Sequence, residues 1–218
     1  MKRLQMLSEL SKNIWTDMAS EAEFYTLDIK RISRTDIDAA YFSMSPERRK
    51  KCDGLRNQAD KDLCIVSDML LRRVLSEKLG IPPAELVFAV TDKGKPYLEG
   101  GAYHFSVSHS GNIAAVAVNR DCPVGIDVEK IRPVSARIIF RFFSESDARF
   151  VLGGSRIENG VIEEREMMTR FFKVWTYKEA FVKMTGEGIG ADLKSISYDE
   201  NKCVSRAFDD YVLTVITK

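Results

Sequence analysis

The sequence predicts an antiparallel α+β protein of two similar halves, each a small sheet packed on one long helix. Two segments have the pattern of long helices. Residues 60–79 place apolar side chains at helical spacing and stop at Gly80, and a second segment, 169–185, ends at Gly186. The strands expected between them follow one another without intervening helices, which favours antiparallel pairing.

The remaining elements are expected from runs of β-branched and aromatic residues. Strands are expected at 24–32, 87–90, 104–108, 112–118, 124–131 and 209–217. A glycine-rich turn at 98–103 is the expected boundary between an N-terminal half, 1–103, and a C-terminal half, 104–218. Residues 1–20 are expected to form a short helical extension.

The 218 residues carry a net charge of +1, with 44% apolar and 30% charged residues. This is the composition of an ordinary globular protein without an overall field that would recruit nucleic acid or a membrane. The N-terminal segment lacks the apolar core of a signal peptide, and no run is long enough to span a bilayer. We therefore expect a cytoplasmic protein whose anion sites are built from a few local cations.

Cysteines and histidines give no sign of a metal cluster. The four cysteines are scattered without a CxxC pair, which favours neither a zinc site nor a disulfide scaffold and suits a reducing cytosol. They are Cys52, Cys64, Cys122 and Cys203. His104 and His109 lie an odd number of residues apart, so on one strand they would face opposite ways.

The strand expected at 124–131 carries two acids on one face. Asp127 and Glu129 alternate with apolar residues, and we expect Gly125 to leave open space beside them. Two carboxylates at this separation can hold one hard divalent cation. The alternative is a half-exposed edge strand whose acids are solvated, and the pattern alone favours that alternative.

The second long helix carries a pair of opposite charges. Glu179 and Lys183 are four residues apart and share a face with Trp175. Such a pair is usually a surface ion pair worth a few tenths of a kcal/mol. Here the neighbours also include Phe181 and Met184, so the charges lie within an apolar helix and suggest a functional role.

Three short segments could contact phosphates: the basic run 46–51, Lys95 in a Gly-Lys-Pro turn, and His109. Each has a plainer alternative, a solvated face or a structural histidine. No GxSxG motif surrounds Ser108 or Ser110, which argues against a serine hydrolase. The chain also lacks a Walker loop and a GxGxxG motif after a strand, so a nucleotide-hydrolysing or dinucleotide-binding core is not expected.

The order of five motifs resembles the phosphopantetheinyl transferases of the large, surfactin-synthetase-activating type. They are GKPY, FSVSHSG, VGIDVEK, FFSESD and WTYKEAFVK, and the likeness runs from about residue 45 to 190. The resemblance implies a pseudo-dimer in one chain with coenzyme A bound between the halves. The implied activity is Mg²⁺-dependent transfer of 4′-phosphopantetheine from coenzyme A to a serine of an acyl or peptidyl carrier protein, releasing 3′,5′-ADP.

The resemblance also implies roles for the charged residues. Asp127, Glu129 and Glu179 match the magnesium ligands of the family. Glu179 also matches the proposed general base for the attacking serine, and Lys183 the lysine that contacts the pyrophosphate. These four residues would therefore form the catalytic centre, in the C-terminal half.

Coenzyme A contacts are implied in both halves. Lys95 and Pro96 match the segment against the adenine, Ser108 and His109 a pair reaching the nucleotide phosphates, and Arg48 and Lys51 cations that hold the 3′-phosphate. Many relatives also carry an arginine and a small hydroxyl residue near the 3′-phosphate. Leu63 and Cys64 stand at those positions here, which puts the grip on the 3′-phosphate in doubt.

The expected partners are coenzyme A and carrier protein domains, with no nucleic acid or membrane, and the protein is expected to be a monomer. The carrier could serve fatty-acid, polyketide or nonribosomal peptide synthesis. It is expected to dock near the segment that follows 142–147 and near the loop 153–166. Phe142 and Phe143 could contact it or belong to the core.

Two other functions remain open from the sequence. A Mg²⁺-dependent pyrophosphohydrolase would use the same three carboxylates without a carrier. A non-catalytic relative that binds coenzyme A or a carrier is favoured by Leu63 and Cys64, but it would have no need of Asp127, Glu129 and Glu179 together.

Overall fold

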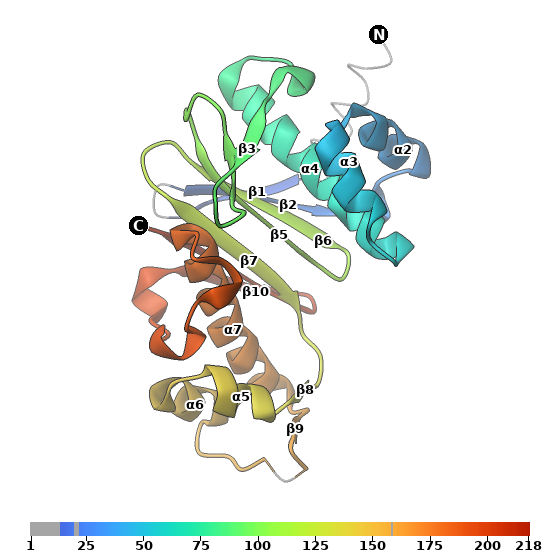
Figure 1. Ribbon diagram of the computed structural model, residues 1–218. Helices are drawn as coiled ribbons and strands as arrows, with labels where there is room; N and C mark the ends of the chain where they lie inside the picture. The colour runs from blue at the N-terminus through green and yellow to red at the C-terminus, as the bar shows by residue number, and fades with distance from the viewer. Residues whose placement is uncertain (1–13, 20–21, 158) are drawn as a thin grey trace.

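A computed structural model describes residues 14–19, 22–157 and 159–218. Its two larger antiparallel sheets meet edge to edge, and each of them packs on one long helix (Figure 1). The first sheet runs β1 (Ile14–Ala19), β2 (Ala22–Asp28), β6 (Ile113–Asn119), β5 (His104–Ser110), and the second runs β10 (Val204–Phe208), β11 (Tyr211–Thr217), β7 (Val124–Lys130). The predicted α+β class with two similar parts is confirmed.

The long helices are α4 (Gln58–Leu79) and α7 (Arg165–Thr185), close to the predicted segments. Each ends at a glycine, Gly80 or Gly186, with φ of 69° and 73°. This left-handed conformation is favourable for glycine and closes a helix C-terminus. The predicted C-terminal end of each helix is therefore confirmed, whereas α7 begins at Arg165, earlier than the predicted residue 169.

Shorter elements complete the chain. On the N-terminal side they are η1 (Ile29–Arg31), α2 (Arg34–Ser43), α3 (Pro46–Asp53), η2 (Pro83–Glu85), β3 (Phe88–Val90) and β4 (Pro96–Leu98). On the C-terminal side they are β8 (Val134–Ser135), α5 (Arg137–Phe142), α6 (Glu145–Leu152), β9 (Val161–Ile162), η3 (Gly188–Gly190), η4 (Leu193–Ser195) and η5 (Glu200–Lys202). Helices α5 and α6 lie at the opposite end of the molecule from α2 and α3 (Figure 1).

Strand β6 is buried along its whole length, as predicted. Its even-numbered residues, such as Val116, belong to the core cluster that contains α4. Its odd-numbered residues, such as Ala115, belong to a second cluster with β7 and β11. One strand thus contributes to the core on both sides of the first sheet, because its side chains alternate between faces.

A third core cluster packs the N-terminal part of α7 against α5 and α6. Phe143 is 2% exposed and stacks on Phe171 with ring centroids 5.1 Å apart. Phe142 is half-buried and contacts Trp175 edge to face at 5.8 Å. The structure therefore supports the core alternative for Phe143, and the exposed aromatic ring of α5 is instead Phe140, at 75%.

The N-terminal helix prediction is wrong for residues 14–19. They form β1, which pairs with β2 in the register Ile14↔Leu27. Backbone pairing with β2 gives these β-branched and aromatic residues a partner that the sequence pattern did not show. The rest of the predicted extension, 1–13 and 20, lies outside the described residues.

Strands β5 and β6 follow the expected boundary at 98–103 in the chain, yet they pair within the first sheet beside β2. The division into halves at 103 stays a prediction. Over the ranges that the structure describes, no helix combines the length and apolar character needed to cross a membrane.

Candidate active site

Three serines on one face of β5 join the two sheets. Ser106, Ser108 and Ser110 point towards β7, where the edge strands of the sheets meet. Their Oγ atoms accept hydrogen bonds from the backbone N–H groups of Ile126, Val128 and Lys130 at 3.1, 3.2 and 3.1 Å, respectively. We call this set the serine ladder. It satisfies edge N–H groups that would otherwise lack a partner.

Two rungs of the serine ladder also orient the acids of β7. Ser108 Oγ donates to Asp127 Oδ1 at 2.7 Å, and Ser110 Oγ donates to Glu129 Oε2 at 2.8 Å. Each hydroxyl therefore acts as acceptor and donor at once, which a serine can do. The two carboxylates are held by the neighbouring sheet, and Asp127 is only 5% exposed. The alternative of a solvated edge strand is wrong for Asp127.

Gly125 has a different role from the predicted one. A Cβ built on it would overlap the carbonyl oxygen of Ala180 and lie 2.8 Å from Met184 N. The glycine does not leave open space beside the acids, because the backbone of α7 fills that space. It allows the close approach of helix and strand that brings Lys183 Nζ to 2.6 Å from Asp127 Oδ1.

The third carboxylate, Glu179, lies within electrostatic reach of the other two. Burial raises the pKa of Glu179 above its usual value, with further increases from Asp127 and Glu129, while Lys183 opposes them. Burial and Asp127 likewise raise the pKa of Glu129. This mutual influence indicates that three negative groups are gathered in one partly dehydrated region.

The donors of this region suit a hard divalent cation. Asp127 Oδ2 is buried without a hydrogen-bond partner among the described residues, and all three acids offer oxygen. In the part of the chain that the structure describes, however, no three His, Cys, Asp or Glu side chains are arranged so that they could hold a metal ion. The Lys183 ammonium instead neutralises Asp127 directly. The three acids therefore suit magnesium by the type and charge of their donor atoms, whereas their arrangement in the described residues is not that of a metal site.

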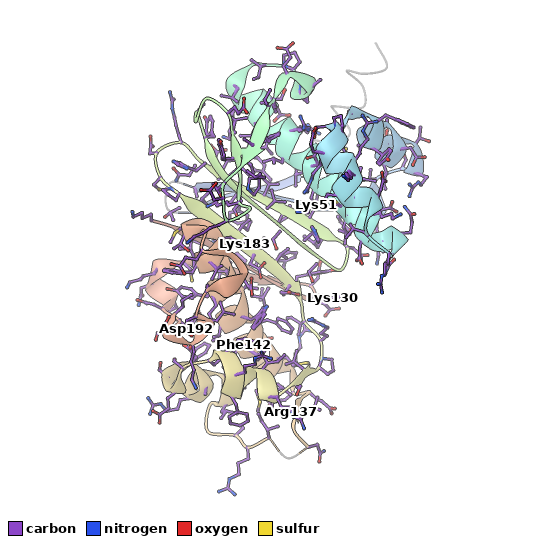
Figure 2. The ribbon with its side chains drawn as sticks, in the orientation of Figure 1. Lys51, Lys130, Arg137, Phe142, Lys183 and Asp192 are labelled. Atoms are coloured by element: carbon purple, nitrogen blue, oxygen red, sulfur yellow. The ribbon has the colours of Figure 1, made fainter. Side chains whose placement is uncertain are left out.

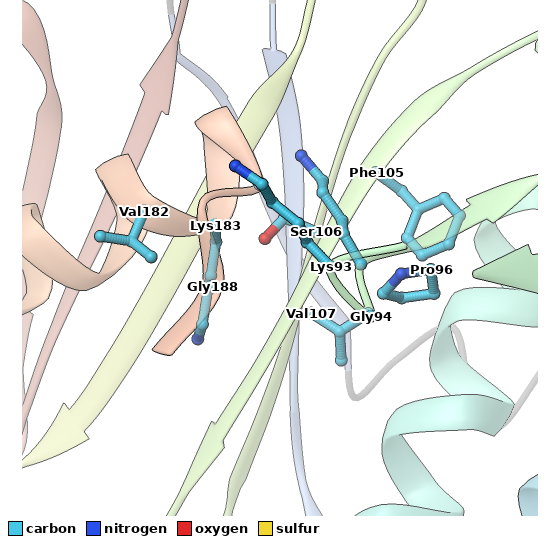
Figure 3. A pocket seen from close by; sticks show the side chains of 11 residues that line it. Lys93, Gly94, Pro96, Phe105, Ser106, Val107, Val182, Lys183 and Gly188 are labelled. Carbon is cyan, nitrogen blue, oxygen red and sulfur yellow. The ribbon is translucent and has the colours of Figure 1, made fainter. Parts of the chain in front are cut away.

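A cavity of about 260 Å³ adjoins this region (Figure 3). Its walls come from the turn before β4, from β5 and from the end of α7, and they include Pro96, Ser106 and Lys183. Lys95 also lines it, but its Nζ donates to Met184 O at 2.8 Å, at the C-terminus of α7. Burial lowers the pKa of Lys95. This lysine therefore connects the turn to α7 as well as facing the cavity.

The predicted phosphate contacts of the N-terminal side lie on α3 and β5. Arg48 Nε is 3.5 Å from Asp68 Oδ1, and Lys51 is exposed (Figure 2). His109 is exposed at the surface, but partial burial of its ring and the positive charges of Lys183 and Arg48 lower its pKa, which favours the neutral ring. The pKa of His109 is therefore lowered by one cation of α7, Lys183, and by one cation of α3, Arg48.

Leu63 and Cys64, which replace polar residues of many relatives, are 4% and 5% exposed. Both face the interior, and Cys64 belongs to the same core cluster as Cys52. Burial, together with the nearby Cys64 thiol, raises the pKa of Cys52 to about 11. These side chains contribute no charge to the candidate site.

Two features of the site were not predicted from the sequence. The first is the structural use of Ser106 and Ser110, for which the alternating serines of β5 were the available signal. The second is a buried ion pair between Lys178 of α7 and Asp147 of α6. Lys178 Nζ lies 2.7 Å from Asp147 Oδ2, with side chains 0% and 1% exposed, and it also donates to Leu193 O and Ile196 O.

Acids and a lysine beside a cavity with basic walls are typical of enzymes that bind a phosphorylated ligand. Residues 123–211 match the model of the 4′-phosphopantetheinyl transferase superfamily. Residues 31–121 match that of the 4′-phosphopantetheinyl transferase N-terminal region.

Curated proteins give the same result. The chain is 31% identical over 167 residues to 4′-phosphopantetheinyl transferase ffp of Bacillus subtilis, covering 76% of this chain and 70% of that protein. It is 32% identical over 166 residues to transferase psf-1 of Bacillus pumilus, covering 76% and 67%. With L-aminoadipate-semialdehyde dehydrogenase-phosphopantetheinyl transferase of Xenopus laevis, identity is 28% over 162 residues, 72% and 54% of the two chains. The chain belongs to the 4′-phosphopantetheinyl transferase superfamily.

Proposed function

We propose that this protein transfers the 4′-phosphopantetheine group of coenzyme A to a serine of an acyl or peptidyl carrier protein, with Mg²⁺, and releases 3′,5′-ADP. Membership of the family supports the reaction class. The observation that supports the site is the gathering of Asp127, Glu129 and Glu179 around Lys183, at the end of a cavity.

Asp127, Glu129 and Glu179 are the proposed magnesium ligands. When bound, the ion would offset the charge of the pyrophosphate and stabilise the leaving group. The repulsion that raises the pKa of Glu129 and Glu179 would be relieved by a divalent cation. Lys183, whose side chain is 31% exposed, would then turn from Asp127 to the pyrophosphate.

Glu179 is the proposed general base. A carboxylate close to the bound metal can accept the proton of an attacking hydroxyl group. The proton of the carrier serine would pass to Glu179, directly or through a water. The serine oxygen would form a bond to the phosphorus that bears pantetheine, and the bond from that phosphorus to the bridging oxygen would break. The electron pair leaves with 3′,5′-ADP, beside Lys183.

The remaining ligand contacts are proposed as implied by the family. Arg48 and Lys51 would hold the 3′-phosphate, and Lys95 and Pro96 would lie against the adenine. The neutral ring of His109 would donate a hydrogen bond to a phosphate. Ser108 differs, since its hydroxyl is engaged by Asp127 and by Val128 N, and we propose that it orients Asp127.

We also propose that the protein is a monomer in the cytoplasm. Its partners would be carrier proteins, and not nucleic acid or membranes. The four cysteines are free thiols, as a reducing compartment would require. The carrier would dock beside α5 and residues 153–166. In that region Phe140 is exposed, whereas Phe143 belongs to the core.

The test is incubation of the protein with Mg²⁺, coenzyme A and a panel of apo-carriers, followed by mass spectrometry. We expect one carrier to gain a single phosphopantetheine group, and Asp127→Ala to abolish the gain while remaining folded by circular dichroism. Breakdown of coenzyme A without a carrier would instead indicate a pyrophosphohydrolase. Binding of coenzyme A with every carrier unmodified would indicate a non-catalytic relative.

A further inference from the structure

The serine ladder follows a repeat. At Ser108 and Ser110, the hydroxyl accepts from the N–H of one β7 residue and donates to the carboxylate of the residue before it. The acceptor and donor capacities of each serine are thus both used, and one strand period separates the two rungs. Because successive rungs are two residues apart on β5, the same geometry would be expected at Ser106, two residues before Ser108.

Ser106 forms the first rung, and its hydroxyl group has no carboxylate to which it could donate a hydrogen bond. Its Oγ accepts from Ile126 N at 3.1 Å, as the repeat requires. The β7 residue before Ile126 is Gly125, which has no side chain. It must be glycine, because α7 occupies the position of a Cβ. Among the described residues, no side chain takes the place that Asp127 and Glu129 fill in the other rungs.

Ser106 is also the rung of the serine ladder that lines the cavity (Figure 3). Its side chain is 5% exposed, so water satisfies its hydroxyl poorly. The cavity also has apolar walls, including Val107 and Val182, and cationic ones, including Lys183. A ligand with a flat heterocycle and phosphates would suit these walls, and it would carry acceptor atoms for the unused O–H.

We propose that Ser106 is a ligand-contacting residue, whose hydroxyl donates a hydrogen bond to the 3′,5′-ADP part of coenzyme A. The acceptor, a purine nitrogen or a phosphate oxygen, reaches the hydroxyl from the cavity that Ser106 lines, because the backbone of α7 fills the space beside Gly125. The identity of the ligand rests on the proposed function. The free hydroxyl itself follows from the repeat of the serine ladder and from the cavity beside it.

Isothermal titration tests this with coenzyme A, 3′,5′-ADP and 4′-phosphopantetheine, in the presence of EDTA. In Ser106→Ala we expect coenzyme A and 3′,5′-ADP to bind roughly 2- to 10-fold more weakly, the loss of one hydrogen bond. Binding of 4′-phosphopantetheine should not change. Adenosine distinguishes the acceptors: it loses affinity in the variant if the purine is the acceptor, and it is unaffected if a phosphate is.

A structural effect of the substitution must be separated from a ligand effect, because Ser106→Ala also removes the acceptor of Ile126 N. Ser67→Ala is a matched control, since Ser67 is another buried serine whose Oγ donates to Leu63 O at 2.6 Å. It should lower stability without weakening any ligand. If Ser106→Ala folds poorly, Ser106→Cys keeps the volume with a weaker donor and should show the same selective loss.

Unchanged binding of 3′,5′-ADP in folded Ser106 variants would overturn the inference. An equal loss for 4′-phosphopantetheine and 3′,5′-ADP would also overturn it, because that result indicates movement of the sheets. Failure of the proposed function is distinguishable. In that case coenzyme A would bind to the unmodified protein and more weakly to Ser106→Ala, but no carrier would be modified.

Discussion

Gly125 and Ala180 are in backbone contact, with no room for a side chain on the strand where the helix crosses it. The contact joins the strand that carries Asp127 to the helix that carries Lys183. A distance of 2.6 Å between Asp127 Oδ1 and Lys183 Nζ depends on it. The position of Lys183 beside Asp127 therefore depends on the glycine at 125 as much as on the two charged residues.

Replacing Gly125 with alanine should push α7 away from β7. We expect a loss of about 1–3 kcal/mol in the free energy of unfolding, the usual effect of overpacking a core, and transfer below detection. Urea denaturation and a carrier-labelling assay measure the two effects. Gly54→Ala is the control, because a Cβ there meets only ordinary contacts of 3.5 Å or more. A Gly125→Ala protein of normal stability and activity would contradict the close approach.

Glu179→Gln should remove the proposed base and a proposed magnesium ligand without opening a cavity. We expect transfer to collapse while coenzyme A binding remains measurable by titration in EDTA. Stability of the metal-free protein should not fall, since the substitution removes a charge that Asp127 and Glu129 repel. Full transfer activity in this variant would exclude Glu179 as the base.

Ser110→Ala should weaken the proposed magnesium site indirectly. The hydroxyl that orients Glu129 at 2.8 Å is lost, and such supporting bonds typically alter metal affinity by about 10- to 100-fold. The Mg²⁺ concentration for half-maximal transfer should rise, with the maximal rate largely restored at saturating Mg²⁺. Threonine at this position keeps the hydroxyl and should behave more like serine. An unchanged Mg²⁺ requirement would mean that Glu129 needs no such support.

Arg48→Ala tests how the 3′-phosphate is bound. Leu63 and Cys64 are buried and uncharged, so the proposed contacts to this phosphate come from α3. We expect coenzyme A to bind roughly 10-fold or more weakly, the usual value for a charged hydrogen bond. The analogue without a 3′-phosphate should lose little. Lys50→Ala, at an exposed position of the same helix, is the control. Equal losses for both ligands would give Arg48 another role.

Asp147→Asn should lower the free energy of unfolding, because it leaves the buried Lys178 without its charged partner. Lys178 is 0% exposed, and breaking such a pair typically destabilises by about 3–5 kcal/mol. Burial alone would raise the pKa of Asp147, but bonds from Lys178 and from Tyr198 N outweigh it and hold the pKa below the usual value. The stabilisation is therefore present above the unfolded pKa, about 3.9, and is lost as pH falls through the folded value.

Thermal unfolding from pH 3 to 7 measures this difference. The unmodified protein should lose its advantage over Asp147→Asn at the acid end of the range. Glu145→Gln, in an exposed pair on the same helix, should match the unmodified protein throughout. A constant gap between the Asp147→Asn and unmodified proteins at all pH values would contradict the assignment.

The sequence predicted what depends on local pattern. The helix periodicity of α4 and α7, and the continuous apolar run of β6, are visible in single segments. The acids of β7 were placed on one face for the same reason. Pairing and contact between distant segments are not visible in a single segment: the local pattern predicts a helix where β1 forms, and it predicts open space beside Gly125 where α7 packs. The serine ladder needs two strands from different sheets, which no single segment reveals.

Strand β6 makes the two halves inseparable as folding units. Val116 and its even-numbered neighbours complete the core around α4, while Ala115 and the odd-numbered residues complete the core around β7. A fragment ending at residue 103 would leave α4 without the strand that covers it, and the complementary fragment would expose one side of β6 to water. The two core clusters therefore share one strand, and we expect them to unfold together as a single cooperative unit.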